Sequence, residues 1–291
     1  MMTLEQLRIF VAVAEREHLT QAADALNLTP SAVSSAIRVL EERYGIALFH
    51  RTGRRIELTE TGQAFLPEAK ATLARAASAD LFLTEISGLK RGRLTLAASQ
   101  TVGGSWLPPR LMRFKATYPA IDIQLSTSNT EQVAEAVLDG RAELGFVEGE
   151  VEHPALSQRV VARDRLVIVA PAGHPLAGSR ASAEALAVAR WVLREPGSGT
   201  RSALIATLAV HGVQEEALDV ALSLPSNEAV RSAVLAGGVL TAVSLAVVED
   251  DIAAGRLAPV VFDLPERAFR LLRHKERYRS KASLAFEEIL A

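Results

Sequence analysis

The residues of this sequence that could do chemistry are hydroxyl side chains and arginines, not a set of catalytic groups. The chain has no cysteine, which excludes disulfides and thiolate metal sites. Its histidines show no metal-ligand spacing; they stand at positions 18, 50, 153, 174, 211 and 274. There is no Gly-x-Ser-x-Gly motif, and Gly197-Ser-Gly-Thr lacks the Gly-Lys-Ser/Thr ending of a phosphate-binding loop. We therefore expect no catalytic residue, no metal and no cofactor.

One polar group lies on a helix that the sequence predicts over residues 30–44. Apolar side chains share one face of this helix: Val33, Ile37, Leu40 and Tyr44. Short polar side chains and one arginine lie opposite them or on the flank: Ser31, Ser34, Ser35 and Arg38. One face is therefore suited to packing, and the other is free to contact another molecule.

Two shorter helices precede this one and must position it. Thr3-Leu4-Glu5-Gln6 is a capping-box pattern that opens the first helix, and Thr20 is expected to cap the second, over residues 21–26. Asn27-Leu28 form a turn, and Thr29-Pro30 start the third helix. Two helices joined by a tight turn, with a polar face on the second, are typical of a helix-turn-helix.

A basic hairpin and a long helix follow. Gly53 separates two short alternating segments, and Arg51, Arg54 and Arg55 cluster at the tip, which predicts a wing. Residues 59–87 then read as one helix with a heptad seam, although it contains Pro67. The seam residues are Leu66, Ala69, Leu73, Ala76, Asp80 and Leu83. The seam favours a dimerising helix; the alternative is an amphipathic helix packed on its own domain.

Beyond a hinge at Lys90-Arg91-Gly92-Arg93 the pattern changes to alternating strands and helices. Strands are expected over 94–98, 121–127, 144–147, 166–171, 191–193, 220–224 and 239–243. Helices are expected over 109–118, 130–139, 182–188, 200–211, 226–236 and 246–254. That order predicts α/β architecture with mostly parallel sheets.

Three hydroxyl-rich segments of this α/β part have the chemistry of an anion site. They are Ser99-Gln100-Thr101, which follows a strand, Asn129-Thr130, which opens a helix, and Gly197-Ser-Gly-Thr-Arg201, a loop that leads into another. Helix N-termini offer free N–H groups and a positive dipole end. Taken alone, the Gly-Ser-Gly-Thr run is a weak motif that is more typical of a turn. Glu148 complicates the prediction: it could be protonated, could meet a donor on the ligand, or could point into solvent.

Length and charge set further bounds. The 291 residues suit about two domains. The net charge is −2, and residues 1–58 carry acidic and basic residues in equal number, so a DNA-binding function must rest on where the charges sit. The N-terminus lacks the basic segment of a signal peptide, and no stretch approaches the roughly 20 apolar residues of a membrane span. We expect a soluble, cytoplasmic protein without a membrane partner.

The order and spacing of about sixty N-terminal residues resemble the signature of the LysR-type transcriptional regulators. The matching residues are Phe10, Ala22-Ala23, Leu26, Ser31-Ala-Val-Ser34, Ile37, Leu40-Glu41, Gly45, Leu48-Phe49, Arg51 and Leu58-Thr-Glu-Thr-Gly62. The rest of the chain is similar to the family at Leu107-Pro-Pro, Tyr118-Pro, Gly140-Arg-Ala-Glu-Leu-Gly, His174-Pro-Leu and Gly197-Ser-Gly-Thr-Arg201. An extracytoplasmic solute-binding protein would share the second part but would have a signal peptide and no winged helix.

The resemblance implies an α/β protein with an N-terminal α winged helix-turn-helix and a C-terminal two-lobed, periplasmic-binding-protein-like α/β effector domain. Its expected boundaries are 1–58 for the DNA-binding domain, 59–92 for the linker helix and hinge, and 93–291 for the effector domain. Lobe 1 would span about 93–161 and 267–291, and lobe 2 about 162–266. The implied partners are double-stranded promoter DNA, a small effector, a homodimer partner through the linker helix, usually within a homotetramer, and RNA polymerase as a further candidate.

The resemblance also implies site residues. Thr29, Ser31, Ser34, Ser35 and Arg38 would line the major groove, with Arg38 suited to a bidentate contact with guanine, and Arg51, Arg54 and Arg55 would meet phosphate or the minor groove. Ser34-Ser35-Ala36 stands where the commoner family pattern has Ser-Arg-Gln or Ser-Lys-Gln, so readout of DNA shape gains weight. The effector, held between the lobes, would contact Ser99, Gln100, Thr101, Asn129, Thr130, Glu148, Ser198, Gly199 and Thr200.

Residues 149–154 and 193–201 resemble family members tied to sulfur, nitrogen or carbon-fixation genes. That resemblance points to a small inorganic or carboxylate anion as the effector.

Overall fold

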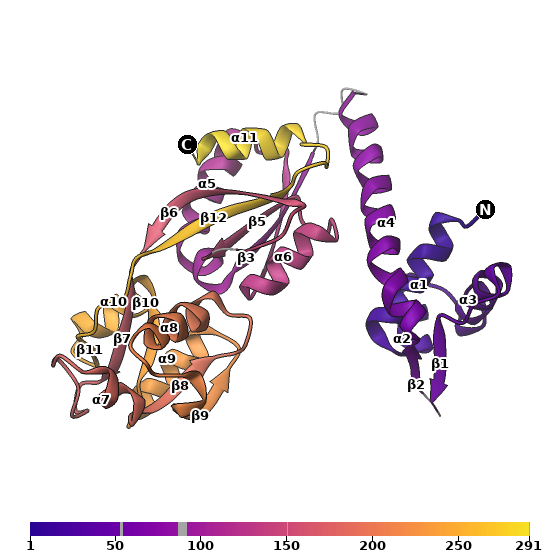
Figure 1. The fold of residues 1–291 in the computed structure, drawn as a ribbon. Coiled ribbons are helices and arrows are strands. Elements are labelled where there is room, and N and C mark those ends of the chain that lie inside the picture. Colours follow the sequence, from indigo (N-terminus) through magenta and orange to yellow (C-terminus); the bar gives the residue numbers. More distant parts are fainter. Residues whose placement is uncertain (53–54, 87–91, 150, 291) are drawn as a thin grey trace. The chain divides into compact units, whose positions relative to one another are not determined.

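The computed structural model describes residues 1–52, 55–86, 92–149 and 151–290. The chain folds into two compact units, one built from the elements up to α4 and the other almost entirely from those from β3 onward (Figure 1). Among the described residues, none of the helices combines the length and apolar character needed to span a bilayer.

The first unit begins with three helices, α1 (Leu4–Arg16), α2 (Leu19–Leu26) and α3 (Pro30–Tyr44). Thr3 forms the predicted capping box with Gln6, and Thr29 caps α3 as predicted, its hydroxyl accepting from the Ala32 N–H. The predicted Thr20 cap is wrong. α2 starts earlier, because His18 adopts the extended capping conformation and its Nδ1 accepts from the Gln21 N–H, which leaves Thr20 inside the helix.

The apolar faces of these helices meet in one core that includes Phe10, Val33, Ile37 and Leu40. Tyr44 does not join it, contrary to the prediction, and is 53% exposed. It is the last residue of α3, next to the capping residue Gly45.

A hairpin and a long helix complete the unit. β1 (Phe49–Thr52) and β2 (Arg55–Leu58) pair antiparallel as expected, and α4 runs over Glu60–Ile86 with Pro67 inside it. Pro67 costs one backbone hydrogen bond without ending the helix. A Cβ on Gly62 would lie 2.1 Å from the Leu48 carbonyl oxygen, so α4 starts tightly against the hairpin only because this residue is glycine. The tip residues Gly53 and Arg54, and Lys90-Arg91 of the expected hinge, lie outside the described residues.

The expected seam of α4 divides into two parts. Leu66, Ala69 and Leu73 pack against the core of their own unit, as the alternative interpretation expected. Phe82 and Leu83 are 43% and 65% exposed. Of the seam residues, the first ones are thus used within their own unit, whereas Leu83, near the end of α4, is exposed.

The second unit has two lobes. Lobe 1 is a five-stranded sheet in the order β4-β3-β5-β12-β6, made of β3 (Arg93–Ser99), β4 (Asp122–Ser128), β5 (Leu144–Glu148), β6 (Leu156–Asp164) and β12 (Arg267–His274). Its helices are the π-helix η1 (Val102–Trp106), α5 (Leu107–Thr117), α6 (Thr130–Leu138) and α11 (Lys281–Ile289). Phe114, Phe146 and Phe286 fill its core and contact one another.

Lobe 2 lies between β6 and β12 in the sequence. It contains a three-stranded sheet, β10-β7-β11, and the pair β8-β9. Its strands are β7 (Leu166–Pro171), β8 (Arg190–Arg194), β9 (Asp219–Leu224), β10 (Thr241–Ser244) and β11 (Leu257–Val260). Its helices are α7 (Ala183–Ala187), α8 (Gly199–Val210), the short η2 (Glu215–Ala217), α9 (Asn227–Ala236) and α10 (Leu245–Ala253). β6 and β12 thus carry the chain between the lobes (Figure 1).

The expectation of mostly parallel sheets is wrong. β3 pairs parallel with β4 and β5, and β8 with β9, whereas β12 pairs antiparallel with β5 and β6, and β7 with β10 and β11. The chain leaves lobe 1 along β6 and returns along β12 in the opposite direction, which imposes antiparallel pairing on the sheet they join.

Candidate functional site

The exposed face of α3 holds the polar side chains expected to contact DNA. Ser31, Ser35 and Arg38 are exposed, and the Arg38 side chain is 68% accessible, with Glu42 3.7 Å away one turn along the helix. Ser34 is half-buried. The Thr29 hydroxyl serves as the helix cap and lies 3.1 Å from that of Ser31.

One carboxylate fixes the hairpin relative to this face. Glu41, on α3, accepts hydrogen bonds from the backbone N–H groups of Leu48 and Phe49 at 2.7 and 3.1 Å. The backbone of Arg51 pairs with that of Ile56, and the backbone of Arg55 with that of Thr52, in the ladder of this hairpin. Arg54 lies outside the described residues. The hairpin therefore starts from a fixed position beside α3.

The residues expected to contact an effector come from four elements and collect where the two lobes meet. Most are nine-tenths or more buried: Ser99, Thr101, Asn129, Thr130, Glu148, Ser198 and Thr200. Gly199 begins α8 against lobe 1, and a Cβ there would lie 2.7 Å from the Glu148 carbonyl oxygen. Gln100 instead borders a separate cavity of about 280 Å³ with Arg231 and Asp251.

Arg267 is the centre of this inter-lobe cluster, although its sequence pattern did not predict it as a site residue. It is the first residue of β12, and its side chain is only 5% exposed. Nε donates to Asp164 at 2.7 Å, Nη1 to Thr200 at 2.8 Å and Nη2 to Thr101 at 3.4 Å. One guanidinium therefore joins the crossover strands to both lobes.

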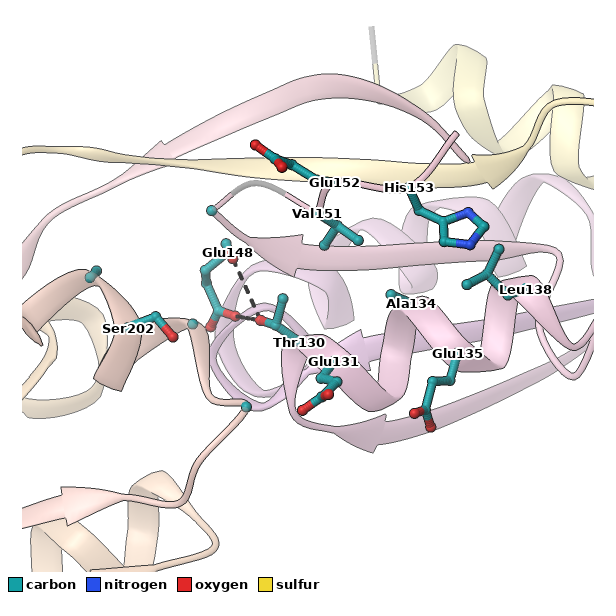
Figure 2. Close-up of a pocket in the computed structure, with 14 residues that line it drawn as sticks. Thr130, Glu131, Ala134, Glu135, Leu138, Glu148, Val151, Glu152, His153 and Ser202 are labelled. Carbon is teal, nitrogen blue, oxygen red and sulfur yellow. Dashed lines mark hydrogen bonds between the residues drawn. The ribbon is translucent and has the colours of Figure 1, made fainter. Parts of the chain in front are cut away.

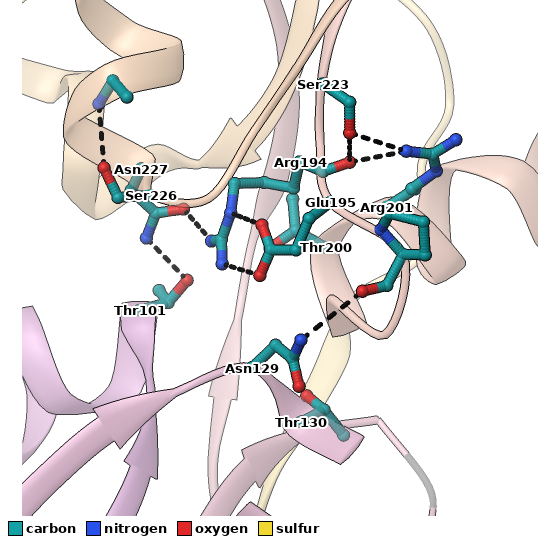
Figure 3. Close-up of polar contacts among 12 residues, drawn as sticks. Thr101, Asn129, Thr130, Arg194, Glu195, Thr200, Arg201, Ser223, Ser226 and Asn227 are labelled. Carbon is teal, nitrogen blue, oxygen red and sulfur yellow. Dashed lines mark hydrogen bonds and ion pairs between the residues drawn. The ribbon is translucent and has the colours of Figure 1, made fainter. Parts of the chain in front are cut away.

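A second chain of contacts crosses the lobes beside it. Arg194 pairs with the Glu195 carboxylate at 2.8 and 2.9 Å and donates to Asn227 Oδ1 at 2.7 Å. Asn227 Nδ2 then donates to Thr101 Oγ1 at 3.2 Å (Figure 3). The Thr101 oxygen thus accepts from Asn227 and Arg267, and the Thr200 oxygen accepts from Arg267. Because both hydroxyls act as acceptors in these bonds, each keeps its own proton to donate.

Two donor groups of the cluster lack a partner among the described residues. Ser99 Oγ is buried and has none, although such groups nearly always find one. α8 has no side-chain cap at Ser198, and the first N–H groups of a helix have no partner within it. Together with Arg267, these groups place several hydrogen-bond donors in the inter-lobe cluster.

A cavity of about 630 Å³ opens beside the cluster, and its charged lining is acidic apart from His153. Glu131 and Glu135 on α6 and Glu148 and Glu152 border it (Figure 2). Glu148 is 3% exposed, and its Oε2 accepts from the Thr130 hydroxyl at 3.4 Å. It therefore does not point into open solvent, which excludes one of the alternatives left open by the sequence.

The smaller cavity holds a strongly paired carboxylate. Asp251, on α10, is fully buried and accepts from Arg231 and from Arg256, the latter at 2.8 Å. The hydrogen bond from Arg231, and next that from Arg256, lower the pKa of this carboxyl against the opposing effect of burial. This carboxylate is fully compensated, unlike Glu148.

The sequence did not predict four residues of the cluster as site residues, because each has an ordinary local pattern. They are Asp164, Arg194, Asn227 and Arg267. Arg267 begins an alternating strand, as a surface arginine would, and Asn227 follows the helix cap Ser226. The available signal was that the chain was expected to cross between lobes near Arg267. A charged side chain at such a crossing lies close to both lobes.

Comparison with known proteins matches both units. Residues 4–63 match the model of the bacterial regulatory helix-turn-helix protein, lysR family, and residues 87–291 match that of the LysR substrate binding domain. The chain is 36% identical to YeiE, an uncharacterized HTH-type transcriptional regulator of Escherichia coli K12, over 98% of this chain and 95% of that protein. It is 32% identical to the RuBisCO operon transcriptional regulator of Allochromatium vinosum, over 99% and 95%.

Among solved structures, the CcmR regulatory domain of Synechocystis PCC6803 in complex with 2-PG covers 69% of this chain and 96% of that chain. Its TM-score is 0.63 at 29% identity. The family models and the curated relatives cover essentially the whole chain. The chain belongs to the LysR-type transcriptional regulators, in which a DNA-binding helix-turn-helix is joined to an effector-binding domain.

Proposed function

We propose that the exposed face of α3 and the hairpin read promoter DNA, and that a small anion bound in the inter-lobe cluster controls this binding. We assign DNA contact to residues 1–58, the linker to 59–92 and effector binding to 93–291. No catalytic role is proposed. The single observation that carries the anion is the buried donor set of Arg267, the unpartnered Ser99 hydroxyl and the uncapped start of α8.

The donor set favours an anion for two reasons. A buried guanidinium and free helix N–H groups both stabilise negative charge, and they do so more strongly away from water. Ser99 Oγ loses its hydration on burial, so a ligand acceptor would restore the missing hydrogen bond. The 2-PG complex of the related CcmR regulatory domain supports a small molecule in this domain.

The DNA side of the proposal rests on which groups α3 leaves free. Arg38 is suited to the two acceptors of a guanine edge, and the short side chains of Ser31 and Ser35 let the helix approach the bases. Arg51, Arg54 and Arg55 would contact the phosphates or the minor groove. Half-site spacing would follow from a homodimer formed through the exposed part of α4, usually within a homotetramer, with RNA polymerase as a further partner.

Binding to the DNA upstream of the chain's own gene and the divergent neighbouring gene tests the DNA part. We expect protection of a dyad, and Arg38→Ala should weaken specific binding by roughly tenfold to hundredfold, the value of one bidentate base contact. Arg93→Ala is the matched control, because it removes the same charge from an exposed ion pair in the other unit. Equal loss in both variants, or no specific protection at low salt, would contradict the assignment.

A ligand panel tests the effector part. Thermal unfolding of the full-length protein is followed with small inorganic and carboxylate anions and with uncharged and cationic metabolites. Saturable stabilisation by an anion, weakened in Ser99→Ala, supports the proposal. Stabilisation only by an uncharged or cationic compound, or an anion that binds but leaves the DNA footprint unchanged, would overturn it.

A further inference from the structure

Glu148 lies at the edge of the donor cluster with acceptor capacity left over. It ends β5, and its backbone oxygen and Cβ are packed against Gly199, the first residue of α8. Its carboxylate accepts one hydroxyl hydrogen bond at 3.4 Å and lies 3.9 Å from Arg267 Nη2. Two carboxylate oxygens offer about four acceptor positions, so this buried group can take a further donor.

The charges around it are unbalanced. Arg267 is matched at 2.7 Å by Asp164, on β6, which also accepts from Ser244. Glu148 therefore faces a guanidinium that another carboxylate already pairs. On the α6 side the cavity adds Glu131 and Glu135, and across it lie Glu152 and His153. The side chains around Glu148 therefore carry excess negative charge, beside a set of donors suited to an anion.

A fully deprotonated oxyanion would place like charges side by side in a buried site, which is costly. An oxyanion that keeps one proton would instead direct its O–H to Glu148 and its bare oxygens to Ser99, Arg267 and α8. Such a ligand matches both parts of the site: its bare oxygens accept from the protein donors, and its O–H donates to the Glu148 acceptor.

Resting on the proposed anion site, we propose that Glu148 selects the effector. It accepts a hydrogen bond from a tetrahedral oxyanion that retains a proton at neutral pH, and it rejects oxyanions that have none. Hydrogen phosphate belongs to the accepted class, as do phosphate monoesters in their singly charged, protonated form, and sulfate belongs to the rejected class. Glu148 is thereby a specificity-determining residue rather than a structural one.

Two pairs of anions of similar shape isolate the proton. Phosphate and arsenate carry at least one proton at neutral pH, whereas sulfate and selenate carry none. Binding to the full-length protein is measured by calorimetry at constant ionic strength. We expect phosphate and arsenate to bind about tenfold to hundredfold tighter than their partners, the usual effect of a hydrogen bond to a charged group. Equal binding within each pair would overturn the proposal while leaving an anionic effector intact.

The variant Glu148→Gln replaces the carboxylate with a group that can donate. It should remove or reverse the preference within each pair, and a ratio measured on one preparation does not depend on how much of the variant is folded. Glu135→Gln, an exposed change in the same cavity wall, should leave the ratio unchanged. A ratio unchanged in Glu148→Gln would overturn the assignment of selection to this residue.

A last comparison uses two phosphate esters that differ in whether they carry an ionisable proton. Methyl phosphate keeps an ionisable proton while it is singly charged, below its second pKa of about 6, and dimethyl phosphate has none, so the two are compared below that pH. The wild type should bind the first and not the second, and Ser99→Ala should weaken all the anions by a similar factor, because it removes a donor without changing charge. No saturable binding of any anion would overturn both this proposal and the anionic effector.

Discussion

The two candidate binding surfaces of this chain differ in how much of their hydrogen bonding the protein already uses. α3 presents Ser35 and Arg38 to water, and Arg38 forms an exposed ion pair with Glu42. Between the lobes, Thr200 and Arg267 are buried and bonded to each other, and Asp164 completes the set. A change on the exposed surface should therefore alter binding alone, whereas a change in the cluster should alter stability as well.

The largest expected effect is that of Arg267→Met, which keeps much of the side-chain volume but removes the charge. Asp164 and Glu148 would then be buried carboxylates without their cation, at a cost of about 3–5 kcal/mol in the free energy of unfolding. Both tryptophans, Trp106 and Trp191, belong to this unit, so urea unfolding followed by tryptophan fluorescence reports on it. Arg38→Ala should change the free energy of unfolding of its own unit, followed by far-UV circular dichroism, by less than about 0.5 kcal/mol. Similar losses in the two variants would contradict the comparison.

Asp251→Asn should rank second. At neutral pH the variant should lose about 2–3 kcal/mol of unfolding free energy, because two guanidinium hydrogen bonds to a buried carboxylate are weakened. The pKa of Asp251 is lowered in the fold, so its contribution is present above the unfolded value of about 4 and is lost as pH falls through the folded pKa. The difference between wild type and variant should therefore shrink below about pH 4. Asp250→Asn, its exposed neighbour, is the control; a gap constant with pH would refute this account.

Gly199→Ala tests the close approach of the lobes. The added Cβ would lie 2.7 Å from the Glu148 carbonyl oxygen and 2.8 Å from Thr130 Oγ1, so α8 must move away from lobe 1. We expect a loss of about 1–3 kcal/mol in unfolding free energy and faster hydrogen exchange at the start of α8. Gly104→Ala is the control, because nothing lies within 4 Å of its added Cβ. Equal effects would show that the contact has room to relax.

The sequence predicted the exposed surface better than the buried one, and the reason is physical. A helix cap, a turn and an apolar face involve residues a few positions apart, so α1, α3 and the hairpin followed from local pattern. The Thr20 cap failed because His18, one of the less common capping residues, competed locally. The hydroxyls of the cluster were proposed from strand ends and helix starts, and the family resemblance supplied their convergence.

The partners of those hydroxyls could not be predicted in this way. Arg267 and Thr200 are 67 positions apart, and Asn227 and Thr101 are 126 apart. The antiparallel return of β12 that brings Arg267 to the cluster was itself missed, because β6 and β12 were not expected as strands. Pairings over such separations depend on the tertiary fold, and local periodicity carries no signal for them.

Thr29→Ala should have a smaller effect on stability than the changes in the cluster. The effect should still be measurable at this exposed position, because Thr29 caps α3. Its hydroxyl is satisfied, since it accepts from the Ala32 N–H, and loss of such a cap costs about 1 kcal/mol. Hydrogen exchange of the first amides of α3 measures this locally. Ser35→Ala, on the exposed surface of the same helix, should leave the exchange rates nearly unchanged. If Ser35→Ala has the larger effect, the hydroxyls of this helix have structural roles that the geometry does not show.

Ser99→Ala should have the smallest effect on stability, although Ser99 is buried. A buried hydroxyl without a partner has lost its hydration and gained nothing in return, so its removal should leave the free energy of unfolding unchanged or raise it by up to about 1 kcal/mol. Thr101→Val, which removes an acceptor used by Asn227 and Arg267, should be destabilising at a neighbouring position. If Ser99→Ala proved as destabilising as Thr101→Val, its hydroxyl would have a partner within the protein. A variant that is as stable as the wild type but binds anions less tightly would instead show that the hydroxyl is kept for the ligand.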